Sequence, residues 1–340
     1  MKISAHTHRV LLLFSIVVIL SLNLFYSPTS IAVASESRYR AWLATLKREV
    51  LSKGIPLNTL KTTLSRVELA PRVIELDRRQ LEPALTLDQY LSRVISKDRV
   101  LIGRKKLIKN RILLDRIAEL YGVQPRFLVA LWGVETDFGR ITGSFPVIDS
   151  LVALIYDGRR SSFFKRELIH ALRILDEGHV SIDEMKGSWA GAMGQLQFMP
   201  STFRGFAVDF DNDGRKDIWK SHADAFASAA NYLSQSGWNY DQTWGQEAFF
   251  PEDIDRTSIR FKQRKRLSAW KALGLRPLKG RNFPSKDFMS SVIQPEGAAS
   301  QAFLVYDNYR VILRWNRSHR FALSVGILSD LIGDPVESLL

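Results

Sequence analysis

Glu135 is the residue of this chain whose setting most clearly points to chemistry. It follows the wholly apolar run Phe127–Trp132 and lies close to Phe138. Apolar surroundings penalise the charged form of a carboxyl group and raise its pKa, so the group stays protonated. Such a protonated acid can supply the proton that a departing glycosidic oxygen needs. A lone acid of this kind indicates chemistry on glycans. The alternative is a purely structural role, as a helix-end carboxylate in a salt bridge.

A second segment supplies the groups of a binding cleft. The block Gly187–Ser201 contains too much glycine and alanine for an ordinary amphipathic helix. Its small residues let the backbone approach something bulky, and Ser188, Gln195 and Gln197 add neutral hydrogen-bonding groups. These features are typical of a polar site that contacts sugars.

Most glycosidases use a second carboxylate, about 5–5.5 Å from the first in retaining enzymes and about 6.5–9.5 Å in inverting ones. No convincing partner for Glu135 is evident. Asp137 is two residues away and points elsewhere on a helix, and Asp149 and Asp157 are too distant along the chain to be placed.

The segment 209–220 predicts a calcium site. It resembles the opening of an EF-hand loop, with carboxylates at positions 1, 3, 5 and 9 and Gly214 at position 6. The expected ligands are the side chains of Asp209, Asp211 and Asp213 and the backbone carbonyl of Arg215. Lys220, at position 12, cannot supply the usual bidentate carboxylate; the alternative is a solvated acidic turn.

The elements that must position these residues are mostly helical up to about residue 239. We expect helices over 107–121, from Pro125 to about Glu135, over 162–177 and over 224–235, with Leu113, Ile117 and Leu120 facing inward in the first. Short strands are expected over 244–250, 290–293, 303–306 and 311–315, with a hairpin turn at Asp307–Asn308 and a helix over 321–332. The predicted fold class is mainly α (α+β), with a small mixed or β-rich insertion at 240–310 and a C-terminal strand and helix at 311–340.

Composition limits the compartment and the partners. The 340 residues include 48 basic and 35 acidic side chains, a formal charge of +13, which favours polyanions, although no nucleic-acid-binding motif is present. Most basic residues are scattered, apart from the run Lys262–Arg266. The absence of cysteine excludes disulfides, a thiolate nucleophile and a cysteine-anchored lipoprotein.

The N-terminus has the pattern of an export signal. Basic residues precede the apolar run Val10–Tyr26, and Ala32 and Ala34 fit a cleavage site. We therefore expect a signal peptide at 1–34 and a soluble periplasmic or cell-envelope protein; an uncleaved anchor is the alternative.

Six motifs, taken in order, resemble one known family: the lytic murein transglycosylases of the membrane-bound lytic transglycosylase B type, also called the soluble lytic transglycosylase B group. The motifs are Val134–Gly139, Asp157–Arg160, Gly187–Ser201, Asp209–Gly214, Ala230–Tyr232 and Arg314–Ser318, and the resemblance extends from about Tyr39 to Ile332. It implies a lysozyme-like helical catalytic region at 35–239. It also implies a single-carboxylate mechanism in which Glu135 acts first as acid and then as base. The substrate would be peptidoglycan and the product a 1,6-anhydromuramic acid.

The resemblance also assigns further residues. The positions that it implies for substrate binding are Ser188, Gln197, Phe198, Tyr232, Arg159, Arg160, Trp315, Asn316 and, more weakly, Tyr90. It implies Asp224 as the last calcium ligand, although Asp224 could instead cap the next helix. The duller alternatives are that Tyr232 and Trp315 are core residues and that the arginines are surface charges.

The family implies a monomer whose partners are glycan strands and other cell-wall enzymes. Two other functions compete with it: a lysozyme-type hydrolase and a non-catalytic wall-binding scaffold.

Overall fold

The computed structural model describes residues 28–79, 85–251, 255–257, 259–278, 282–297 and 300–333, and the side chains from Glu36 onward within them. The chain divides into two compact units, residues 1–46 and 47–340. The apolar run of the predicted leader lies outside the described residues. Within the part that is described, no helix has both the length and the apolar character needed to cross a membrane.

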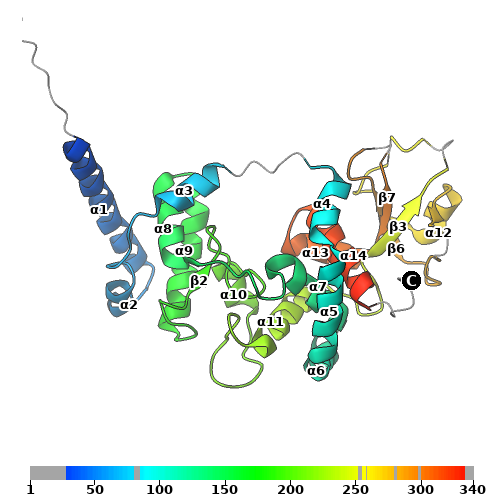
Figure 1. Ribbon diagram of the computed structural model, residues 1–340, viewed down its shortest axis with the longest axis horizontal. Coiled ribbons are helices and arrows are strands. Elements are labelled where there is room, and N and C mark those ends of the chain that lie inside the picture. The colour runs from blue at the N-terminus through cyan, green and yellow to red at the C-terminus, as the bar shows by residue number, and fades with distance from the viewer. Residues whose placement is uncertain are drawn as a thin grey trace, which may run out of the picture. The chain divides into compact units, whose positions relative to one another are not determined.

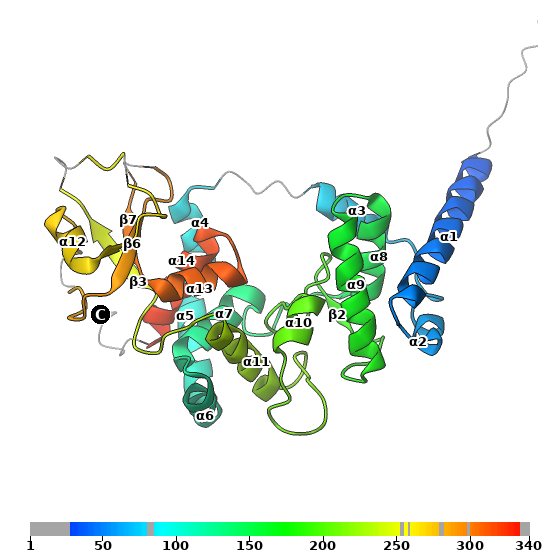
Figure 2. The same ribbon diagram turned by 180° about the vertical axis from the view of Figure 1, so that it is seen from behind.

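Helices dominate the fold (Figures 1 and 2). Their bounds are α1 Pro28–Ser52, α2 Leu57–Thr62, α3 Pro71–Arg78, α4 Leu87–Val94, α5 Lys97–Lys109, α6 Arg111–Tyr121, α7 Pro125–Thr136, α8 Val147–Asp157, α9 Ser161–Asp176, α10 Pro200–Phe206, α11 His222–Gln235, α12 Leu267–Ala272, α13 Asp307–Trp315 and α14 His319–Gly333.

The central helix of the larger unit is α7. Its residues Phe127–Gly133 are all buried, because the helix is apolar on every side and is surrounded by α5, α6, α11 and α14. Pro125 opens the helix at a position where its missing N–H costs nothing, as expected from the sequence. A second group of helices is formed by α8 and α9, which pack side by side (Figure 1).

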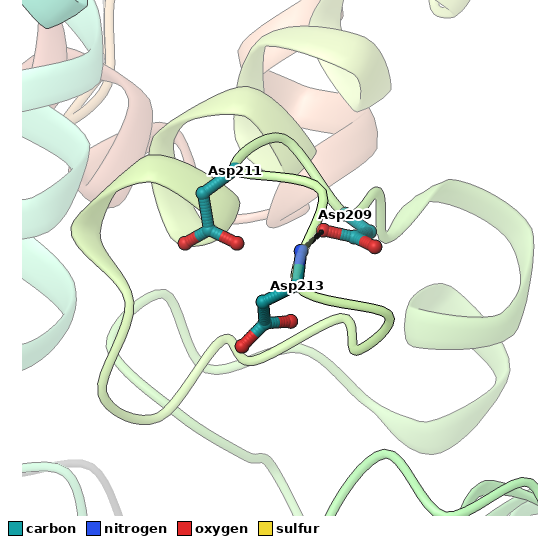
Figure 3. A group of neighbouring side chains, drawn as sticks. All are labelled: Asp209, Asp211 and Asp213. Atoms are coloured by element: carbon teal, nitrogen blue, oxygen red, sulfur yellow. Dashed lines mark hydrogen bonds between the residues drawn. The ribbon is translucent and has the colours of Figure 1, made fainter.

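Two irregular segments join these helices. The glycine-rich block runs between β2 (Lys186–Gly187), which pairs with β1 (Phe145–Pro146), and α10. The acidic segment 209–220 loops out between α10 and α11 (Figure 3).

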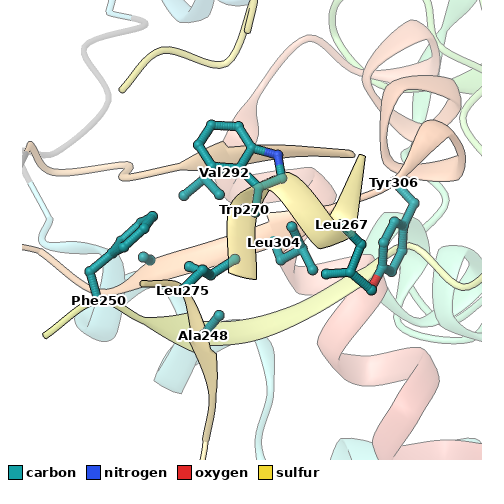
Figure 4. Packing of buried hydrophobic residues seen from close by; sticks show 9 residues of the cluster. Ala248, Phe250, Leu267, Trp270, Leu275, Val292, Leu304 and Tyr306 are labelled. Carbon is teal, nitrogen blue, oxygen red and sulfur yellow. The ribbon is translucent and has the colours of Figure 1, made fainter. Parts of the chain in front are cut away.

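The predicted β-rich insertion contains a five-stranded antiparallel sheet in the order β4-β6-β7-β3-β5. The strands are β3 Gly245–Phe249, β4 Lys265–Arg266, β5 Arg276–Pro277, β6 Met289–Ile293 and β7 Ala302–Val305. Its own core includes Trp270 and Tyr306 with Leu267, Leu275 and Leu304 (Figure 4). The expected fold class, mainly helical with a small sheet, is confirmed.

Two predicted elements are wrong. Residues 311–315 form part of helix α13 instead of a strand, and Asp307–Asn308 begins that helix instead of a hairpin turn. The buried residues Asn308, Val311 and Ile312 recur at helical spacing, whereas the β-branched pair Val311–Ile312 alone suggested a strand.

The helix expected over 107–121 is also interrupted. Asn110 ends α5 and precedes α6, and its side-chain Nδ2 donates to the Lys106 carbonyl at 2.8 Å. Within α6, Leu114 and Ile117 are buried while Leu120 is exposed, so the prediction is right for Ile117 and wrong for Leu120.

Candidate active site

Glu135 lies in the last turn of α7, partly exposed and surrounded by protein atoms. Desolvation raises the pKa of its carboxyl group to about 7, and a hydrogen bond from Trp315 opposes that rise. In this bond the indole Nε1 of Trp315 donates to Oε1 of Glu135 at 2.8 Å. The acid is therefore poised between its protonated and ionised forms near neutral pH.

The other carboxylates considered from the sequence have partners of their own or lie in another cavity. Asp137 is buried and forms ion pairs with Arg99, at 3.3 Å, and with Arg140. Asp157 pairs with Arg78. Asp149 lines a separate cavity of about 270 Å³ together with Arg66 and Lys186. Glu135 is thus a single carboxyl group at its site among the acids considered.

Trp315, which hydrogen-bonds the acid, is one of three aromatic residues in mutual ring contact. Phe198 of the glycine-rich block and Tyr232 of α11 lie with their ring centroids 5.3 and 5.0 Å from that of Trp315, at the end of α13. Phe198 and Tyr232 are also in ring contact at 6.3 Å. The Tyr232 hydroxyl donates to the Arg314 carbonyl at 2.8 Å. Segments that are far apart in the chain therefore form one aromatic wall, and Trp315 connects this wall to Glu135.

The polar side chains of the glycine-rich block are bound to backbone. The Ser188 hydroxyl accepts from the Ala192 amide at 3.1 Å, and Gln197 Nε2 donates to the carbonyls of Thr142 and Gly194, each at 3.0 Å. Gln197 adopts a positive φ of 51°, an unfavourable conformation for a residue with a side chain. These bonds fix the shape of the block.

Thr136, directly after the acid, makes structural contacts that the sequence analysis did not anticipate. Its buried hydroxyl donates to the Gln195 carbonyl at 2.7 Å and accepts from the Gly139 amide at 3.1 Å. It joins the end of α7 to the glycine-rich block where Asp137 and Phe138 both have positive φ. The only hint of this role in the sequence was that a residue with a hydroxyl group directly follows Glu135.

The two arginines that were predicted to bind substrate form ion pairs within the protein. Arg159 and Arg160 both pair with the buried carboxylate of Asp77 in α3, at 3.2 and 2.6 Å, and the Arg160 guanidinium lies over the Phe164 ring. Each of the two arginine side chains stays about half exposed, so both remain accessible to solvent.

The remaining two predicted binding residues lie at helix ends or on helix surfaces. Asn316 is exposed directly after α13, where its Oδ1 accepts from the Ser318 amide at 3.0 Å. Tyr90 is half-buried in α4, with the Arg320 guanidinium 6.0 Å from its ring centroid.

The acidic segment brings three carboxylates together as predicted. One carboxylate oxygen from each of Asp209, Asp211 and Asp213 lies within 4.8 Å of the others (Figure 3). The two oxygens of Asp209 accept from the amides of Asp213, at 3.2 Å, and Gly214, at 2.9 Å. No ion pair among the described residues neutralises these three acids. Hard oxygen atoms gathered without a cationic partner fit calcium.

Asp224 and Lys220 have roles that the sequence left open. Ser221 caps α11, and the fully buried Asp224 accepts from the amides of Phe210 at 2.8 Å and Asp217 at 2.7 Å. Lys220 pairs with Glu184. Asp224 thus holds the two ends of the loop together, and the ammonium of Lys220 has a partner outside the three-acid group.

The loop is tied directly to the glycine-rich block. The Gln195 amide donates to the Ile218 carbonyl at 2.9 Å, and the Trp219 indole donates to the Lys186 carbonyl at 3.0 Å. A chain of short contacts therefore runs from the acidic loop through Gln195 and Thr136 to the end of α7.

A helical fold with one desolvated carboxylic acid next to an aromatic wall defines a lysozyme-like class of glycan-cleaving proteins. The model of the family described as "Transglycosylase SLT domain" matches residues 38–330, so the chain belongs to this family. The class predicted from the six motifs, lytic transglycosylases of the B type, is confirmed.

Individual relatives agree with this family. The chain is 32% identical over 250 residues to membrane-bound lytic murein transglycosylase B of Escherichia coli, a match that covers 72% of this chain and 66% of that protein, just under two thirds. SltB3 of Pseudomonas aeruginosa, solved in complex with NAG-anhNAM-pentapeptide, is 39% identical. It matches with a TM-score of 0.83 over 86% of this chain and 79% of its own.

A third relative is the Escherichia coli lytic transglycosylase Slt35, solved in complex with calcium. It is 28% identical, with a TM-score of 0.73 over 85% of this chain and 92% of that one.

Proposed function

We propose that this protein is a peptidoglycan lytic transglycosylase that cleaves the β-1,4 bond between N-acetylmuramic acid and N-acetylglucosamine without consuming water. The observation that carries the proposal is Glu135, a single desolvated acid with a pKa of about 7 beside an aromatic wall. The anhNAM-containing ligand bound to the related SltB3 supports the same chemistry.

In the first step the protonated Glu135 gives its proton to the glycosidic oxygen, and the bond from that oxygen to C1 of the muramic sugar breaks. In the second step the resulting carboxylate accepts the proton of the C6 hydroxyl, whose oxygen bonds to C1 and closes the 1,6-anhydro ring. The enzyme returns to its starting protonation state, and no second carboxylate is needed to activate water. A pKa near the working pH suits both roles.

Phe198, Tyr232 and Trp315 would offer ring faces to the sugars, since they form one aromatic wall that Trp315 joins to Glu135. Ser188, Gln197 and Asn316 would bond the sugar substituents, and Tyr90 would contribute at a greater distance. Arg159 and Arg160 would use their exposed guanidinium atoms for the lactyl or peptide carboxylates, with Asp77 orienting them.

Calcium is proposed as a structural ion. The side chains of Asp209, Asp211 and Asp213 and the Arg215 carbonyl would bind it, and Asp224 would hold the loop in shape. The bound ion would neutralise three crowded acids and stiffen the loop that supports Gln195. The calcium complex of the related Slt35 favours this assignment.

The remaining expectations are proposed with the function. They are export to the periplasm or cell envelope through a leader at 1–34, a monomeric state, and association with glycan strands and other wall enzymes. The division at 35–239, 240–310 and 311–340 is also proposed, with helices α13 and α14 in its last part.

Digestion of purified sacculi by the Glu135→Gln variant tests the proposal. We expect release of soluble fragments to fall by roughly a thousandfold, because general acid catalysis contributes about 10²–10⁴-fold. Glu119→Gln, an exposed change on α6, is the matched control and should act normally. Mass spectrometry of the wild-type products should show fragments one water lighter than hydrolysis products. Hydrated products would instead identify a lysozyme-type hydrolase, and full activity of Glu135→Gln would exclude this acid.

A further inference from the structure

The corner between α5 and α6 exposes large apolar side chains that the proposed catalysis does not use. Ile108 is 75% exposed and Ile112 is 83% exposed, more than the other exposed large hydrophobic residues among those described. They line one shallow hollow of about 340 Å³, together with Asn110 and Leu113. Single exposed apolar residues are ordinary, but two adjacent ones at a helix corner mark an interaction surface.

This apolar pair is not an unfinished part of the core. The inward face of α6, with Leu114 and Ile117, is already buried against its neighbours. Ile108 lies near the end of α5 and Ile112 in the first turn of α6, on either side of Asn110, and neither belongs to that buried face.

Positive charge surrounds the pair. Six basic residues and one acidic residue lie between positions 104 and 116. Lys105 and Lys109, both exposed, take part in no ion pair among the described residues. Arg111 pairs with Asp115 at 2.6 Å and also interacts electrostatically with the exposed phenol of Tyr240.

We propose that the α5–α6 corner docks on an anionic lipid bilayer, with Ile108 and Ile112 inserted at the interface and Lys105, Lys109 and Arg111 over the lipid phosphates. Exposed aliphatic side chains ringed by lysine and arginine, with a tyrosine at the rim, are the composition that binds such a surface. A second copy of the chain is a poorer occupant, because a twofold contact would bring the same cations together. The docking is independent of the proposed catalysis.

The lack of native cysteine allows a local test in the full chain. Ile112→Cys is labelled with an environment-sensitive fluorophore and mixed with vesicles of phosphatidylcholine, with or without phosphatidylglycerol. We expect a blue shift and protection from an aqueous quencher only with the anionic vesicles. The same label at Leu57→Cys, an exposed position at the start of α2, should not respond. The label reports its own surroundings, so this control separates corner insertion from a membrane contact made elsewhere.

Charge neutralisation provides a second measurement. In the labelled protein, Lys105→Gln with Lys109→Gln should weaken vesicle binding by roughly 30-fold, since each cation near an anionic surface contributes about fivefold. The matched pair Lys61→Gln with Lys262→Gln removes the same charge from exposed sites elsewhere and should change binding little.

Three results would overturn the proposal: no spectral change at position 112 with anionic vesicles, an equal change at position 57, or a lipid-independent change that grows with protein concentration. The last would identify a second copy of the chain as the occupant. Sacculus digestion is not part of the readout, so failure here leaves the catalytic proposal untouched.

Discussion

Two opposing influences set the proton affinity of Glu135. Burial favours the neutral acid, while the hydrogen bond from the Trp315 indole favours the carboxylate. Burial is the larger influence, so the pKa lies above its ordinary value of 4.5, at about 7. The protonated form that the proposed first step requires is therefore present below about pH 7 and is lost above it.

Trp315→Phe should separate these two influences. It keeps an aromatic ring but removes the N–H donor, so the pKa of Glu135 should rise further. We expect the alkaline limb of the pH profile of kcat/KM to move upward by about one pH unit, the size expected for a hydrogen bond to a charged group. The profile should be measured on a soluble glycan fragment.

Trp238→Phe is the matched control, because it also removes an indole hydrogen bond, here to Gln124 at 2.8 Å. Its alkaline limb should stay in place. An unmoved limb in Trp315→Phe would show that the observed titration does not belong to Glu135.

At the scale of elements, the glycine-rich block depends on close backbone contact. A Cβ on Gly143, whose φ is +90°, would lie 2.1 Å from the carbonyl oxygen of Gly187. Only glycine fits both the conformation and the space. The contact places the start of the block against the turn that follows α7.

Gly143→Ala should therefore lower both stability and activity. Backbone strain and the forced shift of Gly187 should destabilise the fold by about 2–4 kcal/mol, measured by urea unfolding. Gly205→Ala in α10 is the control, because no atom lies within 4 Å of the added Cβ. Equal stabilities of the two variants would contradict the role given to the block.

The acidic loop makes a separate prediction about calcium. Calcium at about 100 times its dissociation constant should stabilise the native protein by about 2.7 kcal/mol. Asp209→Ala should abolish this effect, because it removes one of three converging carboxylates and two amide contacts.

Calcium titration by calorimetry and the calcium dependence of Tm provide the measurements. Asp183→Ala, an exposed acid outside the loop, should bind calcium as the unchanged protein does. Unaltered calcium binding by Asp209→Ala would assign the loop a purely structural, metal-free role.

For the whole molecule, net charge should govern encounter with the substrate. The formal charge of +13, or +11 (13 − 2) once Lys2 and Arg9 leave with the proposed leader, attracts an anionic wall polymer at long range, and salt screens that attraction. Raising the ionic strength should increase KM for sacculi several-fold and leave kcat on a short soluble fragment nearly unchanged. Parallel assays at low and high salt measure the difference, and salt-independent KM values would remove charge from the account of substrate binding.

The sequence alone determined the family and the segment in which three aspartates cluster, and it predicted Glu135 as the acid. Each of these features lies within a short contiguous segment, where local spacing largely dictates geometry. Pro125, the apolar run of α7 and the glycines of the loops specify their local conformations in the same way.

Only the tertiary structure decided which distant groups meet. The Trp315 indole reaches Glu135 across 180 positions of the chain, and Arg160 reaches Asp77 across 83. The helical state of 311–315, the break at Asn110 and the exposure of Leu120 were also decided only by the tertiary structure. Such outcomes depend on contacts between segments that are remote in sequence. The hydrophobic periodicity of one segment does not show which other segments it packs against in the folded protein.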